Sequence, residues 1–190
     1  MVISFGGNIG SGKSTIAKML AAELNWPRFY IGGILREKAK ERGMTIDEFY
    51  KLGETDPSID KEVDDYQKNL GETQDNFVIE GRTSWFLIPH SLKIFLSVDE
   101  KIGAERVMND IINSNHRNEG SDIRTLDDVI KINRERKQSE ILRYKQYYNK
   151  DIFNLANYDL VIDTSDLNQQ QVFDQVFAYV KTKLETIDKS

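Results

Sequence analysis

The feature that most constrains the fold of this chain is a glycine-rich loop between two regular elements near the start of the sequence. Residues 2–5 form a short apolar run, and the spacing G-x-x-x-x-G-K-S follows over residues 7–14. From residue 13 to residue 24, apolar side chains recur at helical spacing. A strand, a loop of this kind and a helix in this order direct backbone N–H groups and a positive helix terminus at one anion. The sequence therefore predicts a phosphate-binding loop between a buried strand and a helix.

The residue types in the loop suit a nucleotide. Glycines allow the backbone conformations in which successive N–H groups converge on phosphate oxygens. Lys13 is long enough to reach the β- and γ-phosphates, and the Ser14 hydroxyl is a ligand for Mg²⁺. We expect a nucleotide phosphate and Mg²⁺ to bind here, although such loops serve kinases, GTPases, motors and switches alike.

Further strands follow along the chain. Dense β-branched and aromatic residues mark them at about 28–31, 76–80, 92–98 and 160–162. Helical patterns lie between these runs, and a terminal helix is expected at about 168–184. Strands that alternate with helices indicate an α/β fold with a parallel sheet and helices on both faces.

We predict a single domain over residues 1–190. Two polar stretches, at about 33–70 and 110–137, read as insertions over the sheet. The first is helical in pattern from Thr45 to about Leu70, with a break at residues 56–57.

Composition excludes several classes of protein. The chain is 39% hydrophobic and 30% charged, which is typical of a soluble globular protein. Its net charge of −5 argues against nucleic acid as a partner, and the absence of cysteine excludes thiolate catalysis and Cys-ligated zinc. We see no signal peptide and no apolar run long enough for a membrane span. We therefore expect a cytoplasmic protein, acting as a monomer, with neither membrane nor nucleic-acid partners.

Charged residues follow two of the predicted strands. Glu80 ends the run VIE at the position where loop-type NTPases place a group that acts on the metal through water. Arg82 comes two residues later and can grip a second phosphate bidentately. Arg36 lies one helical turn after the second strand, near the carboxyl ends of the strands where open α/β proteins bind ligands.

A fourth feature is a long helical segment near residues 125–148. Residues 125–128 have capping-box spacing, and an apolar stripe begins there but stops before the polar run at 133–140. A stretch that is polar all round has no core to bury. Arg136, Glu140 and Arg143 fall on one face at i, i+4 and i+7. We expect the two arginines to clamp transferring phosphates and Glu140 to hold them in place.

A phosphate loop and several arginines suggest two phosphorylated ligands held end to end. An acceptor phosphate is already anionic, so it needs no general base, and catalysis becomes alignment and charge neutralisation. A hydroxyl acceptor would favour a carboxylate near the end of the second strand, but residues 30–33 contain no acid. The residues thus favour a nucleoside monophosphate kinase.

The sequence resembles a known family, the short cytidylate kinases of the archaeal type, over nearly its whole length. The similarity is carried by the segments GGNIGSGKST, GGILREKAKERGM, ETDPSID with KEVDDYQ, VIEGR, KIFLSV, RERKQSEILRYKQYY and NYDLVIDTS. The resemblance implies a P-loop NTPase fold with a five-stranded parallel sheet, a monophosphate-binding insertion and a lid over ATP. It also implies transfer of the ATP γ-phosphoryl group to CMP or dCMP, with Mg²⁺ as cofactor.

The resemblance assigns roles to individual residues. The implied ATP-binding residues are Gly7, Asn8, Ile9, Gly10, Ser11, Gly12, Lys13, Ser14 and Thr15. The implied catalytic residues are Lys13, Arg82, Arg136 and Arg143, and the implied monophosphate-binding residues are Arg36, Arg82, Glu140 and Arg143. Ser14 would ligate Mg²⁺ and Glu80 would act on it through water, while Arg106 matches an arginine at the root of the lid.

Two departures from the family pattern bear on specificity. Gly33 and Ser97 stand where the family often has acids, and we expect both to affect the nucleoside end of the acceptor. Three alternatives stay open: an adenylate kinase, another small-molecule kinase, and a nucleotide-binding regulatory module that does not transfer phosphate.

Overall fold

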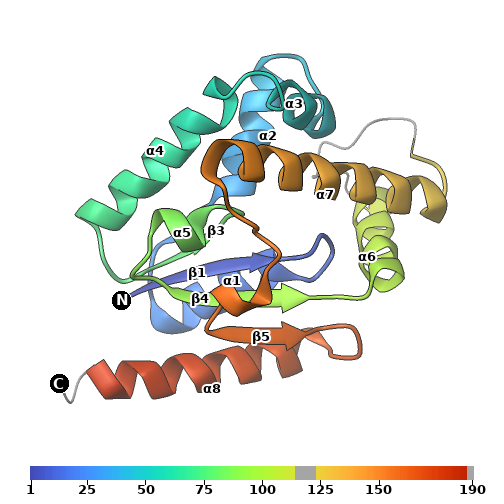
Figure 1. The fold of residues 1–190 in the computed structure, drawn as a ribbon. Coiled ribbons are helices and arrows are strands. Elements are labelled where there is room, and N and C mark those ends of the chain that lie inside the picture. The colour runs from blue at the N-terminus through green and yellow to red at the C-terminus, as the bar shows by residue number, and fades with distance from the viewer. Residues whose placement is uncertain (114–122, 188–190) are drawn as a thin grey trace.

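The fold is built on a parallel sheet of five strands in the order β2-β3-β1-β4-β5 (Figure 1). The computed structural model describes residues 1–113 and 123–187. The strands are β1 (Val2–Gly7), β2 (Arg28–Tyr30), β3 (Phe77–Glu80), β4 (Leu92–Ser97) and β5 (Leu160–Asp163). Every pairing between neighbours is parallel. The predicted α/β fold with a five-stranded parallel sheet is confirmed.

Helices cover both faces of the sheet, as the alternation of elements predicted. They are α1 (Lys13–Leu24), α2 (Ile31–Glu41), α3 (Ile46–Leu52), α4 (Ser58–Thr73), α5 (Ser84–Leu87), α6 (Glu100–Asn113), α7 (Leu126–Tyr148) and α8 (Gln169–Ile187), with a short 3-10 helix at Leu155–Asn157. Helix α8 is the predicted terminal helix, and the break between α3 and α4 falls at residues 53–57, as expected. No residue range for α5 or α6 was predicted from the sequence.

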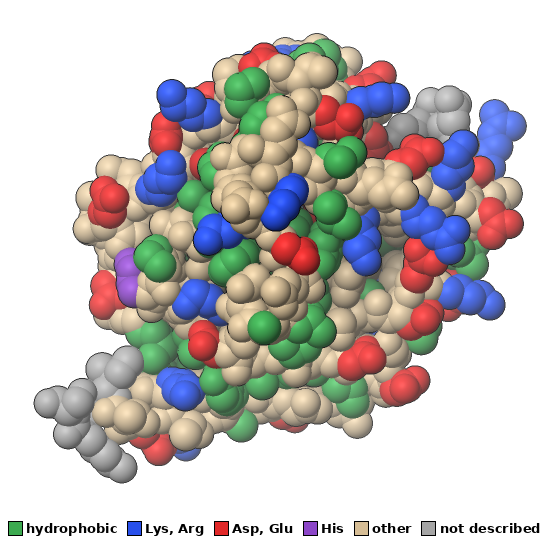
Figure 2. All heavy atoms as spheres, in the orientation of Figure 1, with side chains coloured by type: hydrophobic (Ala, Val, Ile, Leu, Met, Phe, Trp, Pro, Cys, Tyr) green, Lys and Arg blue, Asp and Glu red, His purple; other side chains and the backbone are tan. Residues whose placement is uncertain are grey.

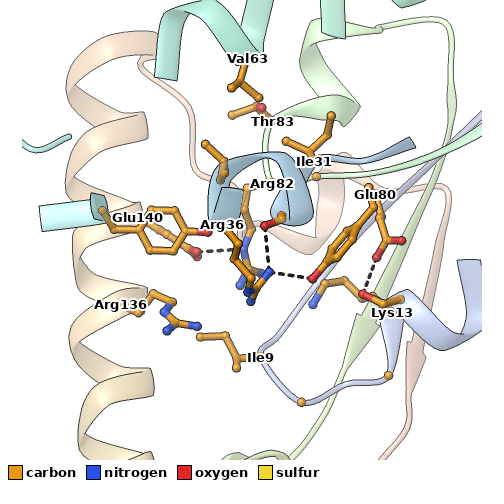
Figure 3. Close-up of a pocket in the computed structure, with 18 of the residues that line it drawn as sticks. Ile9, Lys13, Ile31, Arg36, Val63, Glu80, Arg82, Thr83, Arg136 and Glu140 are labelled. Carbon is orange, nitrogen blue, oxygen red and sulfur yellow. Dashed lines mark hydrogen bonds and ion pairs between the residues drawn. The ribbon is translucent and has the colours of Figure 1, made fainter. Parts of the chain in front are cut away.

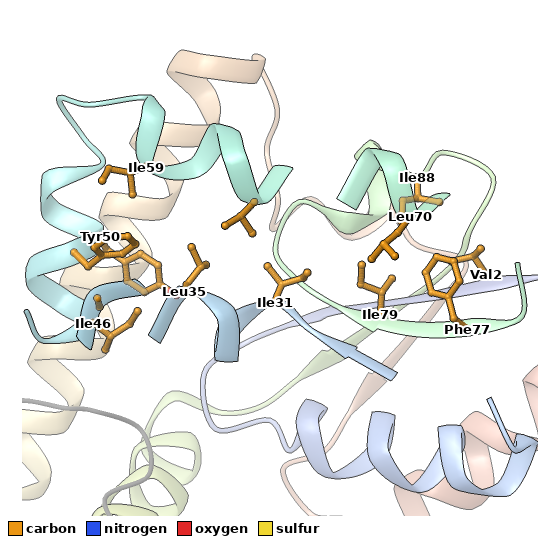
Figure 4. Close-up of a cluster of buried hydrophobic side chains, with 13 residues drawn as sticks. Val2, Ile31, Leu35, Ile46, Tyr50, Ile59, Leu70, Phe77, Ile79 and Ile88 are labelled. Atoms are coloured by element: carbon orange, nitrogen blue, oxygen red, sulfur yellow. The ribbon is translucent and has the colours of Figure 1, made fainter. Parts of the chain in front are cut away.

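Side chains that alternate along the central strands pack into two apolar cores. Val2, Phe77 and Ile79 pack with apolar residues of α2, α3 and α4 (Figure 4). Ile3, Phe5 and other residues of β1, β3, β4 and β5 point the opposite way, toward α1 and α8. Strands buried on both faces are typical of parallel sheets with helices on either side.

The structure describes all of the first stretch predicted as an insertion and most of the second. The stretch at 33–70 contains most of α2, all of α3 and most of α4, and its apolar side chains belong to the same core as the sheet. The stretch at 110–137 takes in the end of α6 and the first half of α7, and its residues 114–122 lie outside the described part of the chain. Helix α7 runs above the sheet from the side of α6 toward α4, and it lies below α3 in the view of Figure 1.

The polar run of α7 carries three buried charged side chains. Arg136, Glu140 and Arg143, which the helical spacing placed on one face, are 5%, 1% and 0% exposed. This face of α7 packs against the α2–α4 layer through ion pairs, so its polar character reflects buried charges with partners on other elements.

The surface agrees with the charge balance of the sequence. Lysine and arginine side chains are interspersed with acidic ones on the face shown in Figure 2, and they form no continuous basic patch there. Among the residues that the structure describes, no helix is both long enough and apolar enough to cross a membrane.

Candidate active site

A cavity of about 410 Å³ lies where the strands end, between the glycine-rich loop, α2, α4 and α7 (Figure 3). The loop contributes Ile9, Gly10, Gly12, Lys13, Ser14 and Thr15 to its lining. The rest of the lining comes from α2, α4, α6 and α7, from the residues that follow β3, and from single residues of β2, β3, α3 and α8. This volume is in the range of small-molecule sites, and its position beyond the strand ends is the usual ligand site of open α/β sheets.

The loop has the backbone geometry that its glycines predicted. Gly7 and Gly10 have φ angles of 143° and 79°, which side chains rarely allow. A Cβ atom at Gly10 would also lie 2.2 Å from the backbone oxygen of Gly103 on α6. Both positions therefore require glycine for the loop to turn between β1 and α1.

Ser14 and Glu80 meet beside the loop, although they are 66 residues apart in the chain. The Ser14 hydroxyl donates to Glu80 Oε2 at 2.6 Å, and Arg28 Nε donates to Glu80 Oε1 at 2.6 Å. A hydroxyl and a carboxylate are oxygen ligands of the kind that Mg²⁺ prefers, and Mg²⁺ takes its remaining ligands from phosphates and water. Ser14 and Glu80 therefore fit a Mg²⁺ ion that is held by few protein groups.

Lys13 lies on the loop itself. Its Nζ donates to the backbone oxygen of Asn8 at 2.6 Å and lines the cavity. Arg106, on α6, lines the cavity from the other side of the loop and donates to the backbone oxygen of Thr164 at 2.8 Å. Both cations therefore stand at the end of the cavity that the loop forms.

Arg36 is held by Tyr30, which the sequence did not mark as a site residue. Its Nη1 donates to the Tyr30 hydroxyl at 2.7 Å and to the backbone oxygen of Gly32 at 2.9 Å. The Tyr30 ring lies against two glycines, so that a Cβ atom at Gly33 would come within 2.7 Å of its Cδ1. The Gly33 departure thus makes room for the ring that positions Arg36. Neither Gly33 nor Ser97 lines the cavity, so any effect of these two residues on the nucleoside end is indirect and stays a prediction.

Arg82 and Glu140 form an ion pair across the cavity. Arg82 Nε donates to Glu140 Oε1 at 3.0 Å, and Arg82 Nη1 donates to the backbone oxygen of Gly7. The second carboxylate oxygen of Glu140 is buried and has no partner among the described residues. Arg82 therefore bridges the phosphate loop and α7.

The arrangement expected for the arginines of α7 needs correction. Glu140 holds neither of them: Arg136 donates to Asp47 on α3 at 2.6 Å, and Arg143 donates to Asp60 on α4 at 2.5 Å. Arg136 lines the cavity, whereas Arg143 lies behind its wall, between Tyr50 and Tyr144 at 5.0 and 5.1 Å from the ring centroids. Helical spacing correctly placed the three residues on one face, but it could not show which partners other elements would supply.

Sequence reasoning missed most of the polar side chains on the α4 side of the cavity. Asp60, Asp64 and Gln67 project from α4 at i, i+4 and i+7, and Thr83 follows Arg82. The same spacing argument that singled out α7 was available for α4. Burial raises the pKa of Asp64 to about 6, and it raises the pKa of Asp60 against the opposing effect of Arg143.

Solved structures with the same fold include kinases. A shikimate kinase from Bacteroides thetaiotaomicron superposes with a TM-score of 0.60 over 97% of this chain and 98% of its own, at 16% identity. An uncharacterized protein from Eubacterium ventriosum gives a TM-score of 0.69 over 95% of this chain and 98% of its own, at 18% identity. Such low identities establish the fold alone.

Proteins with similar sequences identify the family more specifically than the solved structures do. The cytidylate kinase of Methanocaldococcus jannaschii is 39% identical over 181 residues, which are 93% of this chain and 95% of that protein. The cytidylate kinase of Methanococcoides burtonii is 36% identical over 178 residues, 93% of this chain and 94% of that protein. Residues 2–166 match the sequence profile of the Cytidylate kinase-like family. The chain belongs to the Cytidylate kinase-like family.

Proposed function

We propose that this protein transfers the γ-phosphoryl group of ATP to CMP or dCMP, giving ADP and CDP or dCDP. The observation that carries the proposal is a single cavity lined both by the phosphate loop and by Arg36 and Arg82, which come from different elements. Two sets of phosphate-binding groups in one cavity suit two phosphorylated ligands end to end. Membership in the Cytidylate kinase-like family supports cytidine as the acceptor nucleoside.

The donor end would be held by the loop. Its backbone N–H groups and Lys13 would bind the ATP phosphates, and the Ser14 hydroxyl would ligate Mg²⁺ with Glu80 acting through water. Ser14 and Glu80 would hold the ion, and the chemistry that it would supply there is neutralisation of charge on the ATP phosphates. The 2.6 Å contact between Ser14 and Glu80 supports this pairing of roles.

The acceptor end would be held by arginines. Arg36 and Arg82 would bind the phosphate of the monophosphate, one oxygen of which attacks the γ-phosphorus while ADP leaves. That oxygen is already anionic, so no side chain has to remove a proton from it. Catalysis then rests on alignment and charge neutralisation.

To act on the substrates, the charged residues of α7 would have to exchange their present hydrogen-bond partners for groups of the ligands. We propose that Arg136 leaves Asp47 to neutralise the transferring phosphoryl group, and that Glu140 and Arg143 act at the acceptor. Two nitrogens of Arg143 and one oxygen of Glu140 are buried without a hydrogen-bond partner among the described residues, which supports a bound state with further contacts. We further propose that the enzyme works as a monomer in the cytoplasm, and the monomer can be checked by light scattering.

A coupled assay with ATP-Mg²⁺ and CMP, dCMP, UMP, AMP or GMP tests the proposed reaction. We expect the highest kcat/KM with CMP or dCMP, with Lys13→Ala as the blank. Faster turnover of AMP would identify an adenylate kinase instead. Binding of ATP without turnover of any monophosphate would favour a regulatory module.

A further inference from the structure

A closed polar network forms the α4 side of the cavity. It joins Asp64 and Gln67 of α4, Thr83 and Ser84 after β3, and Tyr148 at the end of α7. The first four side chains are at most 3% exposed. Asp64, Gln67 and Thr83 line the cavity, so this network is the part of the wall that a ligand at the α4 side would meet.

Hydrogen bonds within the network use both amide hydrogens of Gln67. Its Nε2 donates to Asp64 Oδ1 at 3.0 Å and to Thr83 Oγ1 at 2.9 Å, while its Oε1 accepts from the Ser84 hydroxyl at 2.6 Å. An amide nitrogen carries two hydrogens. Gln67 therefore has no donor left for a ligand, and its orientation is fixed at both ends.

The hydroxyl hydrogens of Thr83 and Tyr148 are also donated within the network. Thr83 Oγ1 donates its one hydrogen to Asp64 Oδ1 at 2.9 Å, and the Tyr148 hydroxyl donates to Asp64 Oδ2. What remains unused on Asp64 and Thr83 is lone-pair capacity on oxygen. Toward the cavity, the network accepts hydrogen bonds and does not donate them.

The position of the network suits the base of an acceptor nucleotide. Thr83 is the residue next to Arg82, and Figure 3 shows Thr83 and Val63 on the side of the cavity away from Lys13 and Ile9. Ile31 and Val63 line the same region and offer apolar contact for a flat ring. An acceptor whose phosphate binds Arg82 would thus extend its base away from the phosphate loop, toward α4.

We propose that Asp64, fixed by Gln67 and Thr83, selects an acceptor base that carries an exocyclic amino group over one that carries a carbonyl oxygen there. This rests on the proposed monophosphate kinase function and names the residues that set its specificity. Cytosine presents an N–H donor at ring position 4, whereas uracil presents an acceptor. The amino group of cytosine can donate a hydrogen bond to the Asp64 carboxylate. The carbonyl oxygen of uracil would instead face a carboxylate oxygen with no hydrogen between them, which is unfavourable in a buried site.

Replacing Asp64 with an amide tests the inference. Asp64→Asn keeps the shape of the side chain but adds donor hydrogens, so we expect the ratio of kcat/KM for CMP to that for UMP to fall by about 10-fold or more, as loss of a charged hydrogen bond predicts. Asp65→Asn is the matched control, since Asp65 is the next residue on α4 but its side chain is 55% exposed and pairs with Lys68. We expect that control to leave the ratio unchanged.

A second variant keeps the test decisive if Asp64→Asn folds poorly. Thr83→Val removes the hydroxyl that accepts from Gln67 and frees an amide hydrogen, so it should also lower the CMP-to-UMP ratio, and Thr83→Ser should restore it. An unchanged ratio in a folded Asp64→Asn or Thr83→Val protein overturns the inference. Equal use of UMP and CMP by the unmodified enzyme overturns it too, while leaving a monophosphate kinase in place. No turnover of any monophosphate by the unmodified enzyme would remove the proposed function and the inference with it.

Discussion

The two ends of the cavity are built in opposite ways. The donor end is one continuous segment, residues 7–15, whose shape comes from glycine backbone. The acceptor end is assembled from α2, α4, α7 and the residues after β3, which are up to about a hundred residues apart, and its shape comes from ion pairs and hydrogen bonds between side chains. A local motif can therefore identify the donor, whereas the acceptor depends on contacts that only the folded chain creates.

Variants at the two ends of the cavity should have the largest effects on activity. Comparing one variant at each end tests whether the two ends serve different ligands. Lys13→Ala should abolish tight ATP binding and turnover together, because Lys13 stands at the donor end. Arg82→Ala should lower kcat/KM by about 100- to 1000-fold, as expected for loss of a group that stabilises transition-state charge, while ATP still binds. Steady-state kinetics and ATP titration by calorimetry measure both effects.

The Arg82 variant needs a check on folding, since Glu140 is 1% exposed and would lose its ion-pair partner. Urea unfolding shows whether the variant remains folded under assay conditions. Unchanged kcat and acceptor KM in a folded Arg82→Ala protein would remove Arg82 from the acceptor site and weaken the contrast between the two ends.

The next prediction concerns the ion pair that joins α7 to α4. Arg143→Ala should lower the free energy of unfolding by about 3–5 kcal/mol, because it leaves the Asp60 carboxylate buried without its partner. The double variant Arg143→Met with Asp60→Leu should recover much of that loss, since an apolar pair can replace a buried ion pair. Denaturant unfolding of the single and double variants measures the coupling. A small loss in the single variant would mean that the pair contributes little to holding the acceptor end together.

The sequence predicted the fold and the backbone geometry of the glycine-rich loop well because their signals are local. The apolar runs marked every strand within a few residues, and the spacing of residues 7–14 predicted a loop in which Gly7 and Gly10 both have positive φ. Helix α6 was not predicted because its buried residues are small. Gly103, Ala104 and Val107 give little apolar periodicity. The partners of Arg136 and Arg143 were not predictable, since Asp47 and Asp60 lie on helices whose distance from α7 depends on tertiary packing.

Asp64 should give the acceptor end a dependence on pH. Burial raises the pKa of its carboxyl to about 6, so Asp64 is ionised at pH 7.5 and largely protonated at pH 5.5. A protonated carboxyl can donate to the carbonyl oxygen of uracil. The ratio of kcat/KM for CMP to that for UMP should therefore fall several-fold from pH 7.5 to pH 5.5.

This ratio cancels the ionisation of groups that both reactions share, including the acceptor phosphate and ATP. The groups that act on Asp64 are Asp60 and Lys68 of α4, Thr83 after β3 and Tyr148 of α7. Of these, Asp60 also has a raised pKa, so the same profile should be measured with Asp60→Asn to separate the two carboxyls. A ratio that stays constant over this pH range would mean that the charge on Asp64 does not select the base.

The smallest expected effect is at Tyr30, which lies between the two ends. Tyr30→Phe removes the hydroxyl that accepts from Arg36 at 2.7 Å but keeps the ring that lies against Gly32 and Gly33. Loss of one hydrogen bond to a charged group that is open to water should raise the acceptor KM by about 3- to 10-fold, with kcat nearly constant. Tyr66→Phe, on α4, is a suitable control because Tyr66 is 40% exposed and does not line the cavity. If Tyr30→Phe instead changes the KM for ATP and not that for the acceptor, then Arg36 serves the donor end, and the division between the two ends lies elsewhere than at this arginine.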